Sequence, residues 1–365
     1  MQTTRTVLFT GYAPVHFECF RPLYKRFVEA GIEVFVSGGL RTHTENGKVY
    51  DEHGLYNRYG LAPDSILSLD EIRERDFDFL FGANTKILSP RTTGTKVQIF
   101  HGISFRNCAV RAENSEHDFY FVVGSYMHRK FIESGIFPPD DPRALKIGFM
   151  KTDRLLNGEL DRQNLLQQYG FEGNRPVLLY APTGAIHNSL ETMGEEVIKR
   201  VSATSEYDLL IKLHDHPKDT SVDWTERLAF FEDAHTRIVH DFDVIPLLFL
   251  ADMLITDASS VSNEYSLLNR PILFLDVPEL IENAKNANGR MVDLDTWGRR
   301  CGVLVKQAED IVHAVDDSLS YPEQFSDIRK AMATDLFYNP GCATEKALHW
   351  FRTGTEYNDS FTKKY

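Results

Sequence analysis

One stretch of sequence, residues 251–275, decides the fold; it reads ADMLITDASSVSNEYSLLNRPILFL. Its apolar run from Met253 to Ile255 is typical of a buried strand, and the apolar residues from Val261 to Leu268 have helical spacing. A second apolar strand follows Pro271. The pattern predicts a strand, a polar turn, a helix and a second strand, which is the repeating unit of an α/β sheet.

The polar turn of this unit contains Thr256, Asp257, Ser259 and Ser260, and it lies where such folds bind phosphate. Two serines at the start of a helix can offer hydroxyls and unpaired backbone N–H groups to an anion, and the helix dipole favours negative charge there. The alternative is that Ser259 or Ser260 only caps the helix. Taken alone the stretch favours the cap, so the other motifs must decide.

Length and composition describe a soluble globular protein. The chain has 365 residues, which favours two domains because single hydrophobic cores stop growing well below that size. Its composition is 42% hydrophobic and 25% charged, as in ordinary globular proteins. The formal net charge of −13 argues against a nucleic-acid partner, which a basic face would indicate. A small polyanionic ligand stays compatible with that charge, because a pocket can be locally basic.

The cysteines and the N-terminal residues bear on location. Cys19, Cys108, Cys301 and Cys342 are widely spaced and form no paired metal-binding motif, so we expect reduced thiols in the cytoplasm. Residues 1–13 lack the apolar segment of a signal peptide, and no run of about 18 apolar residues could span a membrane. We predict a cytoplasmic protein whose membrane association, if any, is peripheral, on the inner face; the oligomeric state stays open.

Alternating strand and helix patterns run through both halves of the chain. The opening strand 7–10, helix 16–30 and strand 33–37 form a βαβ unit, and residues 41–61 are expected to be an irregular polar insertion. A polar helical segment at 155–171 separates this series from a second one that begins at Val177. We predict α/β architecture with two Rossmann-like domains whose parallel sheets face a central cleft: 1–157, 158–340, and a C-terminal helix in 341–365 that packs back on the first domain.

Polar clusters follow the apolar strands of the first half, where ligands sit in such sheets. His101 and Gly102 come directly after the strand 97–100, and a histidine there could take a proton near neutral pH. The alternative is a structural histidine bonded to a nearby carbonyl, and the sequence does not separate the two. Residues 148–154 form another such turn, in which we expect Asp153 to cap the following helix.

The second half repeats this arrangement. After the strand 177–180, Pro182 and Thr183 predict a tight turn that exposes backbone N–H groups and a hydroxyl to phosphate, with a simple strand-to-loop turn as the alternative. Residues 212–218, at the end of the predicted strand 208–213, contain two histidines and two lysines. His214 and His216 could bind a metal, but no companion ligand motif supports zinc, so anion contact is the better interpretation, with a solvated loop as the remaining one.

Signatures of several other chemistries are missing from the sequence. There is no GxxxxGK[ST] phosphate loop, no GxSxG nucleophile elbow and no HExxH zinc motif. The first strand and helix also lack GxGxxG, which weakens a dinucleotide dehydrogenase interpretation.

Taken together, the motifs resemble the CDP-glycerol glycerophosphotransferase family of teichoic acid primases and polymerases, which have a GT-B fold. The resemblance rests on five motifs in the right order and covers about the last three quarters of the chain; a further closing motif is Leu336 to Gly341. The five are the His101-Gly102 turn, residues 148–155, residues 179–183, residues 212–214, and residues 256–261.

The resemblance implies transfer of glycerol phosphate, or a related polyol phosphate, from a CDP-linked donor to an acceptor hydroxyl, with release of CMP, in the synthesis of teichoic-acid-like or other cell-surface polymers. It implies a lipid-linked or glycan acceptor. His101 and His214 are the expected catalytic histidines, with His101 as the base. We expect no metal or other cofactor. The donor is expected to contact Gly102, Pro182, Thr183, Lys212, His216, Asp257, Ser259, Ser260 and Glu264.

Some residues depart from the family pattern. Phe100 stands where members often have Trp, residues 104–106 differ from the usual Pro-Leu-Lys, and Glu264 replaces the usual Asp, which suggests a different polyol. Other functions stay open. They are a GT-B glycosyltransferase, a nucleotide-sugar epimerase, and a non-catalytic nucleotide-binding scaffold.

Overall fold

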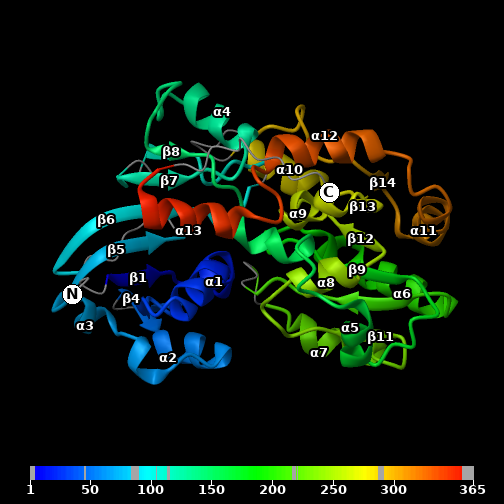
Figure 1. The fold of residues 1–365 in the computed structure, drawn as a ribbon. Coiled ribbons are helices and arrows are strands. Elements are labelled where there is room, and N and C mark those ends of the chain that lie inside the picture. The colour runs from blue at the N-terminus through cyan, green and yellow to red at the C-terminus, as the bar shows by residue number, and fades with distance from the viewer. Residues whose placement is uncertain are drawn as a thin grey trace. The chain divides into compact units, whose positions relative to one another are not determined.

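The computed structural model describes residues 5–44, 47–83, 90–103, 105–112, 116–215, 219, 221–286 and 292–355 (Figure 1). The chain forms two compact units. The N-terminal unit comprises Met1–Gly102, Ala109–Asp153 and Phe337–Tyr365, and the C-terminal unit comprises Ile103–Cys108 and Arg154–Leu336. Apart from the short excursion at Ile103–Cys108, the chain changes unit after Asp153 and again at Phe337, whereas the predicted domain limits were 157 and 340. Within the described residues, no helix is long and apolar enough to cross a membrane.

The N-terminal unit is built on a six-stranded sheet in which every pairing is parallel. The strand order is β2-β1-β5-β6-β7-β8. Its strands are β1 (Thr6–Thr10), β2 (Glu33–Ser37), β5 (Asp76–Gly82), β6 (Thr92–Ile99), β7 (Phe119–Phe121) and β8 (Ala144–Leu145). Its helices are α1 (Pro14–Glu29), α2 (Glu52–Tyr56), α3 (Leu69–Arg73), α4 (Ser125–Glu133) and α13 (Ala343–Thr353), with short turns η1 (Asn57–Tyr59), η2 (Pro63–Ser65) and η4 (Met150–Leu155).

The prediction of an irregular insertion at 41–61 was wrong. This segment forms an antiparallel hairpin of β3 (Leu40–Thr44) and β4 (Gly47–Asp51), followed directly by α2. The missed signal is the dipeptide Asn46-Gly47 between two short strands, a sequence that favours the tight turns of hairpins. Asp51 then starts α2, because its carboxylate accepts the Gly54 N–H at 2.8 Å.

The C-terminal unit contains a second six-stranded parallel sheet, in the order β11-β10-β9-β12-β13-β14. Its strands are β9 (Val177–Tyr180), β10 (Asp208–Ile211), β11 (Thr236–Ile238), β12 (Met253–Thr256), β13 (Ile272–Leu275) and β14 (Val303–Val305). The helices are α5 (Arg162–Tyr169), α6 (Glu195–Thr204), α7 (Trp224–Leu228), α8 (Ile245–Leu250), α9 (Val261–Tyr265), α10 (Pro278–Asn286), α11 (Ile311–Ser320) and α12 (Ser326–Leu336), with short turns η5 (Leu190–Gly194), η6 (Ala229–Phe231), η7 (Ser266–Leu268) and η8 (Ala308–Asp310).

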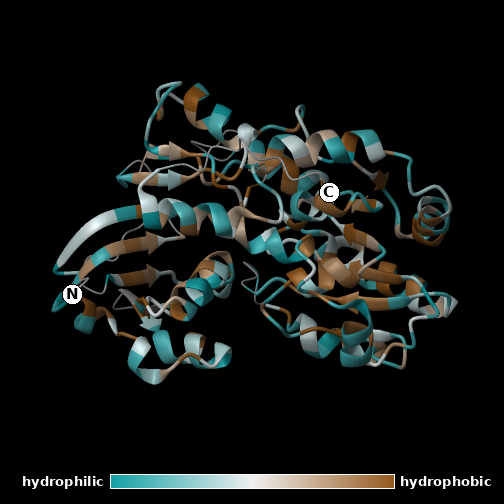
Figure 2. Ribbon diagram, viewed as in Figure 1, coloured by the Kyte–Doolittle hydropathy of each residue, from teal (hydrophilic) through white to brown (hydrophobic). Residues whose placement is uncertain are grey.

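These two sheets confirm the predicted α/β class with a parallel sheet in each half. The strands β9, β10, β12 and β13 are buried along their whole length, as parallel strands covered on both faces must be. Figure 2 shows them as hydrophobic ribbons. The first half of β6 is pale in the same view because it carries Thr92, Thr93, Gly94 and Thr95. Within the segment 155–171, which was predicted to be helical, the α-helix α5 covers only Arg162–Tyr169. The Asp161 side chain caps its N-terminus.

Aromatic packing holds the helices α1 and α13 on the N-terminal sheet. The Phe9 ring of β1 stacks on Phe20 of α1 and on Phe81 of β5, with ring centroids 4.8 and 5.0 Å apart. Phe351 of α13 packs against Phe27 of α1 at 4.4 Å. All of these side chains except Phe351 (4% exposed) are completely buried, so the closing helix belongs to the core of this unit.

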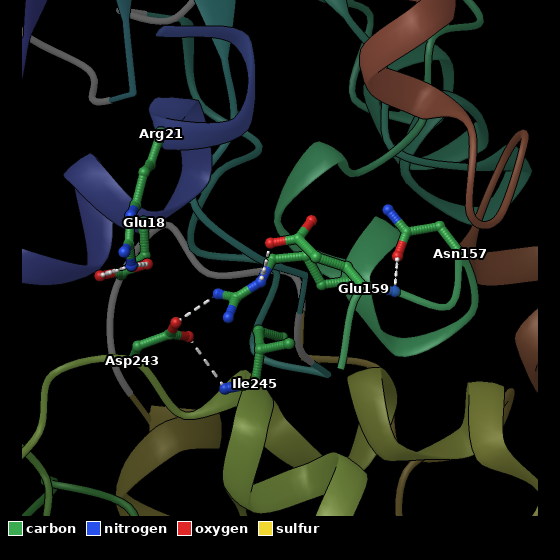
Figure 3. A network of polar contacts seen from close by, with 7 residues as sticks. Glu18, Arg21, Asn157, Glu159, Asp243 and Ile245 are labelled. Carbon is green, nitrogen blue, oxygen red and sulfur yellow. Dashed lines mark hydrogen bonds and ion pairs between the residues drawn. The ribbon is translucent and has the colours of Figure 1, made fainter. Parts of the chain in front are cut away.

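Two neighbouring side chains fasten the chain where it passes between the units. Asp153 accepts the N–H groups of Ala343 at 3.0 Å and Thr344 at 2.7 Å, so it does cap a helix, but that helix is α13 and not the next one along the chain. Arg154 forms ion pairs with Asp243 and with Glu159, the second at 3.1 Å, inside the C-terminal unit (Figure 3).

We predict that the Asp153 carboxylate makes stability depend on pH. Burial raises its pKa to about 6 from the ordinary value of 3.8, although the α13 N–H groups act in the opposite direction. The folded state therefore binds the proton more tightly than the unfolded chain. The protonated Asp153 carboxyl therefore contributes its full stabilisation of the folded state below about pH 4. This stabilisation, which is at most about 3 kcal/mol, is lost as the pH rises through about 6.

The comparison is urea unfolding of the parent protein and Asp153→Asn, which cannot ionise, at pH 4 and pH 7. The free energy of unfolding of the parent, minus that of the variant, should be smaller at pH 7. A larger difference at pH 7 would mean that the helix N–H groups dominate and that the pKa lies below its ordinary value.

Candidate active site

Three predicted motifs of the C-terminal unit come together at one edge of its sheet. The strands β10, β9 and β12 are adjacent and parallel, so the turns that follow them leave from the same carboxyl edge. The chain order along the sheet reverses between β9 and β12, and ligands bind at such switch points in α/β sheets. The Thr256 hydroxyl joins the two turns by donating to the Ala181 carbonyl at 2.6 Å.

Asp257 links the turns at this switch point. Its Oδ1 accepts the backbone N–H groups of Thr183 and Ala258 at 2.9 and 2.5 Å. Its Oδ2 accepts both the N–H and the hydroxyl of Ser189 at 2.9 Å. The side chain is 0% exposed, and four donors occupy its oxygens. In this structure Asp257 therefore shapes the turn after β9, while its role as a donor contact stays a prediction.

The serine pair is the accessible part of the turn after β12. Ser259 and Ser260 are both partly exposed, and neither hydroxyl donates a hydrogen bond to a described residue. Ser260 occupies the N-cap position of α9, yet its side chain caps nothing. The capping interpretation therefore does not account for these hydroxyls, which leaves them available to a ligand.

The lysine-histidine turn after β10 is less open than its sequence suggested. Lys212 is buried and donates from Nζ to the Leu213 carbonyl at 2.8 Å and to Asp215 at 2.6 Å. Its charge is balanced by a carboxylate three residues away, which the sequence interpretation left unweighed. His214 is exposed, and His216 lies outside the described residues.

The remaining predicted contacts of this unit are mostly buried. Thr183 is 4% exposed and Pro182 is also buried, so the turn after β9 could meet a ligand only over a small part of its surface. Glu264 is 3% exposed and lies on α9, with its N–H near the Ser260 carbonyl at 3.4 Å. Their contacts with a donor stay predictions.

In the N-terminal unit, His101 follows β6 and has a defined tautomer. Its Nδ1 lies 2.8 Å from the Ala83 carbonyl, at the end of the neighbouring β5. A carbonyl only accepts, so Nδ1 carries the proton and Nε2 of the neutral ring keeps its lone pair. The pKa of His101 is lowered by burial, and the charges of Lys151 and Arg111 lower it further. At neutral pH the ring is therefore a base. Gly102 after it has a φ of 146°, which favours glycine.

The sequence interpretation missed a second imidazole beside His101. His16, in the first turn of α1, packs against the His101 ring with centroids 4.8 Å apart and an interplanar angle of 60°. Its Nδ1 accepts the Tyr12 N–H at 3.0 Å, and the Tyr12 ring lies 4.4 Å away. Tyr12 lies in the turn after β1 and His16 in the helix that follows, next to the switch point of this sheet, and that position was the available signal.

No group of three or more His, Cys, Asp or Glu side chains in the described part of the chain could hold a metal ion. The metal pair of His214 and His216 was the alternative to the preferred anion contact, and His216 lies outside the described residues. The N-terminal unit contains His101 with His16 beside it, and the C-terminal unit contains a turn that carries two serines.

The sequence is similar to known cell-wall enzymes. The model of the CDP-Glycerol:Poly(glycerophosphate) glycerophosphotransferase family matches residues 85–346. A teichoic acid glycerol-phosphate primase of Bacillus spizizenii is 32% identical over 155 residues, which are 42% of this chain and 39% of the primase. A teichoic acid poly(glycerol phosphate) polymerase of the same organism is 28% identical over 226 residues, 60% of this chain and 50% of the polymerase. The chain spans half or less of these relatives.

Solved structures share the fold. The wall teichoic acid polymerase TagF superposes with a TM-score of 0.68 at 16% identity, covering 96% of this chain and 89% of that chain. Staphylococcus aureus MnaA bound to UDP superposes with a TM-score of 0.59 at 11% identity, covering 95% of this chain and 96% of that chain. At these identities the likeness is one of fold, and it confirms the predicted GT-B class.

We predict that Asp257→Asn loosens the turn after β9. The amide NH2 cannot accept, so two of the four hydrogen bonds are lost. The free energy of unfolding should fall by roughly 3–6 kcal/mol, since each of the two lost bonds to a charged group contributes about 1.5–3 kcal/mol. Amide hydrogen exchange should become faster at Thr183 and Ser189. The matched control is Asp241→Asn at an exposed position. Unchanged exchange at both amides would contradict the proposed bracing role.

Proposed function

Because the chain belongs to the CDP-glycerol:poly(glycerophosphate) glycerophosphotransferase family, we propose that it transfers glycerol phosphate, or a related polyol phosphate, from a CDP-linked donor to an acceptor hydroxyl. In this reaction the acceptor oxygen bonds to the phosphorus that carries the polyol. The bond from that phosphorus to the bridging oxygen breaks, and CMP leaves with the electron pair. The hydroxyl proton must pass to a base.

The state of His101 is the single observation that best supports this function. A general base for a hydroxyl must be neutral at working pH and must have an accessible lone pair. The Ala83 carbonyl accepts a hydrogen bond from the protonated Nδ1, and burial and nearby cations lower the pKa of the ring. We propose that Nε2 of His101 accepts the proton, and that His16 keeps the ring in place through their edge contact.

The donor is assigned to the C-terminal unit. Ser259 and Ser260 supply free hydroxyls at the switch point, where they would donate hydrogen bonds to phosphate oxygens and stabilise the charge that develops there. Asp257 would hold the turn at Thr183 in the shape that the donor requires. His214 is exposed, so it could approach the departing phosphate. Gly102 would allow the backbone after His101 to pass close to a ligand.

The names of the relatives suggest the wider setting. They include primases and polymerases of glycerol-phosphate and ribitol-phosphate polymers, so the polyol and the acceptor are separate questions. We propose a role in teichoic-acid-like polymer synthesis with a lipid-linked or glycan acceptor, at the inner face of the membrane. UDP-N-acetylglucosamine 2-epimerases share the fold at a TM-score of 0.60 and 12% identity, and that likeness alone does not favour their chemistry.

A donor panel tests the function. The protein is incubated with CDP-glycerol, CDP-ribitol, UDP-N-acetylglucosamine and GDP-mannose, with a polyol phosphate or a glycoside as acceptor, and the released nucleotide is identified by chromatography. We expect CMP from a CDP-linked polyol only. Release of UDP would favour a glycosyltransferase, and epimerised UDP-sugar would favour an epimerase. Nucleotide binding without turnover would favour a scaffold.

We predict that His101→Ala lowers kcat by about 10²–10⁴, the usual contribution of a general base, while the Kd for CDP-glycerol changes by less than about twofold. In the parent, the acid limb of kcat/KM should have its midpoint below pH 6.5, because the neutral ring is the active form and its pKa is lowered from 6.5. The control is His313→Ala, at a histidine whose side chain is 82% exposed. Unchanged turnover in His101→Ala would remove this residue from the mechanism.

A further inference from the structure

Four side chains of the N-terminal unit form a continuous row that ends at His101. The Arg41 guanidinium of β3 lies 3.7 Å from the centre of the Tyr12 ring. Tyr12 packs on His16, and His16 packs on His101. They come from the hairpin, the turn after β1, the start of α1 and the turn after β6. Three successive ring contacts therefore connect a cation to the base of the proposed reaction.

The backbone fixes Arg41 in this position. The Arg41 backbone N–H donates to the Tyr12 carbonyl at 3.2 Å, and Arg41 pairs with Tyr50 across the hairpin. A guanidinium close to a tyrosine ring is attracted by the negative ring face, and this contact leaves its N–H groups free to bond elsewhere. Arg41 is partly exposed, and its guanidinium N–H groups donate no hydrogen bond to any described residue. Within the described part of the chain, Arg41 is therefore an oriented cation whose guanidinium donors have no acceptor.

The charge around His101 differs from that of the whole protein. The chain has a formal net charge of −13, yet Lys151 and Arg111 both act on His101 as positive charges. The Arg73 side chain of this unit pairs with the Asp70 carboxylate, whereas the Arg41 guanidinium contacts the Tyr12 ring. A local group of cations on an acidic protein can attract and orient an anion.

We infer that Arg41 binds an anionic group of the acceptor, so that the acceptor carries a phosphate, or a comparable oxyanion, close to the hydroxyl that reacts at His101. The planar fork of a guanidinium matches phosphate oxygens in pairs, which gives both attraction and orientation. Arg41 is thus a specificity-determining residue, and the hairpin that presents it is part of the acceptor site. This inference rests on the proposed function for the identity of the acceptor.

The kinetic test compares two small acceptors, glycerol 3-phosphate and glycerol, with CDP-glycerol as donor. Arg41→Gln should raise KM for glycerol 3-phosphate about tenfold or more, with kcat, the donor KM and the KM for glycerol within about twofold. Arg41→Lys should recover part of the loss, because it keeps the charge without the planar fork. Arg73→Gln removes the same charge at an exposed position and should behave like the parent. Equal losses with both acceptors, or no loss, would overturn the inference.

A binding measurement separates this inference from the proposed function. Imidazole signals of His16 and His101 are followed by NMR while glycerol 3-phosphate or glycerol is added to the parent, Arg41→Gln and Arg73→Gln. We expect saturable shifts with glycerol 3-phosphate only, weakened about tenfold or more in Arg41→Gln. Such shifts without any turnover would leave the anion site standing while the transferase function fails. Shifts that are equal in Arg41→Gln and the parent would overturn the anion site, whatever the turnover.

Discussion

The C-terminal site depends on the hydrogen bonds that the buried carboxylate of Asp257 accepts. This carboxylate is completely shielded from water, so its charge is tolerated only because four hydrogen bonds from Thr183, Ala258 and Ser189 surround it. Those donors come from the turn after β9, the turn after β12 and the residue just before η5. The Asp257 side chain therefore sets the relative positions of the two turns at the switch point. The partly exposed Ser259 and Ser260 lie in one of these turns, so their positions depend on it as well.

A comparable dependence exists in the N-terminal unit. The Ala83 carbonyl at the end of β5 determines which nitrogen of His101 carries the proton, and His16 and Tyr12 support the ring from the side of β1. In both units the supporting groups are backbone atoms and side chains at the carboxyl ends of neighbouring parallel strands. The sheet order thus converts residues that are far apart in the chain into neighbours, and no single motif could supply the site by itself.

The sequence predicted the turns but not the state of their side chains. The family resemblance implied that Lys212 and Asp257 both contact the donor. In the structure Lys212 is paired with Asp215, and the Asp257 carboxylate accepts hydrogen bonds from backbone and hydroxyl donors. Whether a charged group faces solvent or a neighbour depends on burial and on partners up to 74 residues away, as for Thr183 and Asp257. Residue type and spacing do not carry that information.

The sequence by itself determined the α/β class, most strands and helices, and the turns after β6, β9, β10 and β12, because apolar periodicity and turn residues are local properties. The family that its motifs resemble was confirmed by the match over residues 85–346. Only the tertiary structure decided that residues 41–61 contain a hairpin, that Asp153 caps α13, and that Arg41, Tyr12 and His16 lead to His101. Those features require contacts between segments that are apart in the chain, and their free energy comes from burial and hydrogen bonding that exist only once the N-terminal unit has folded.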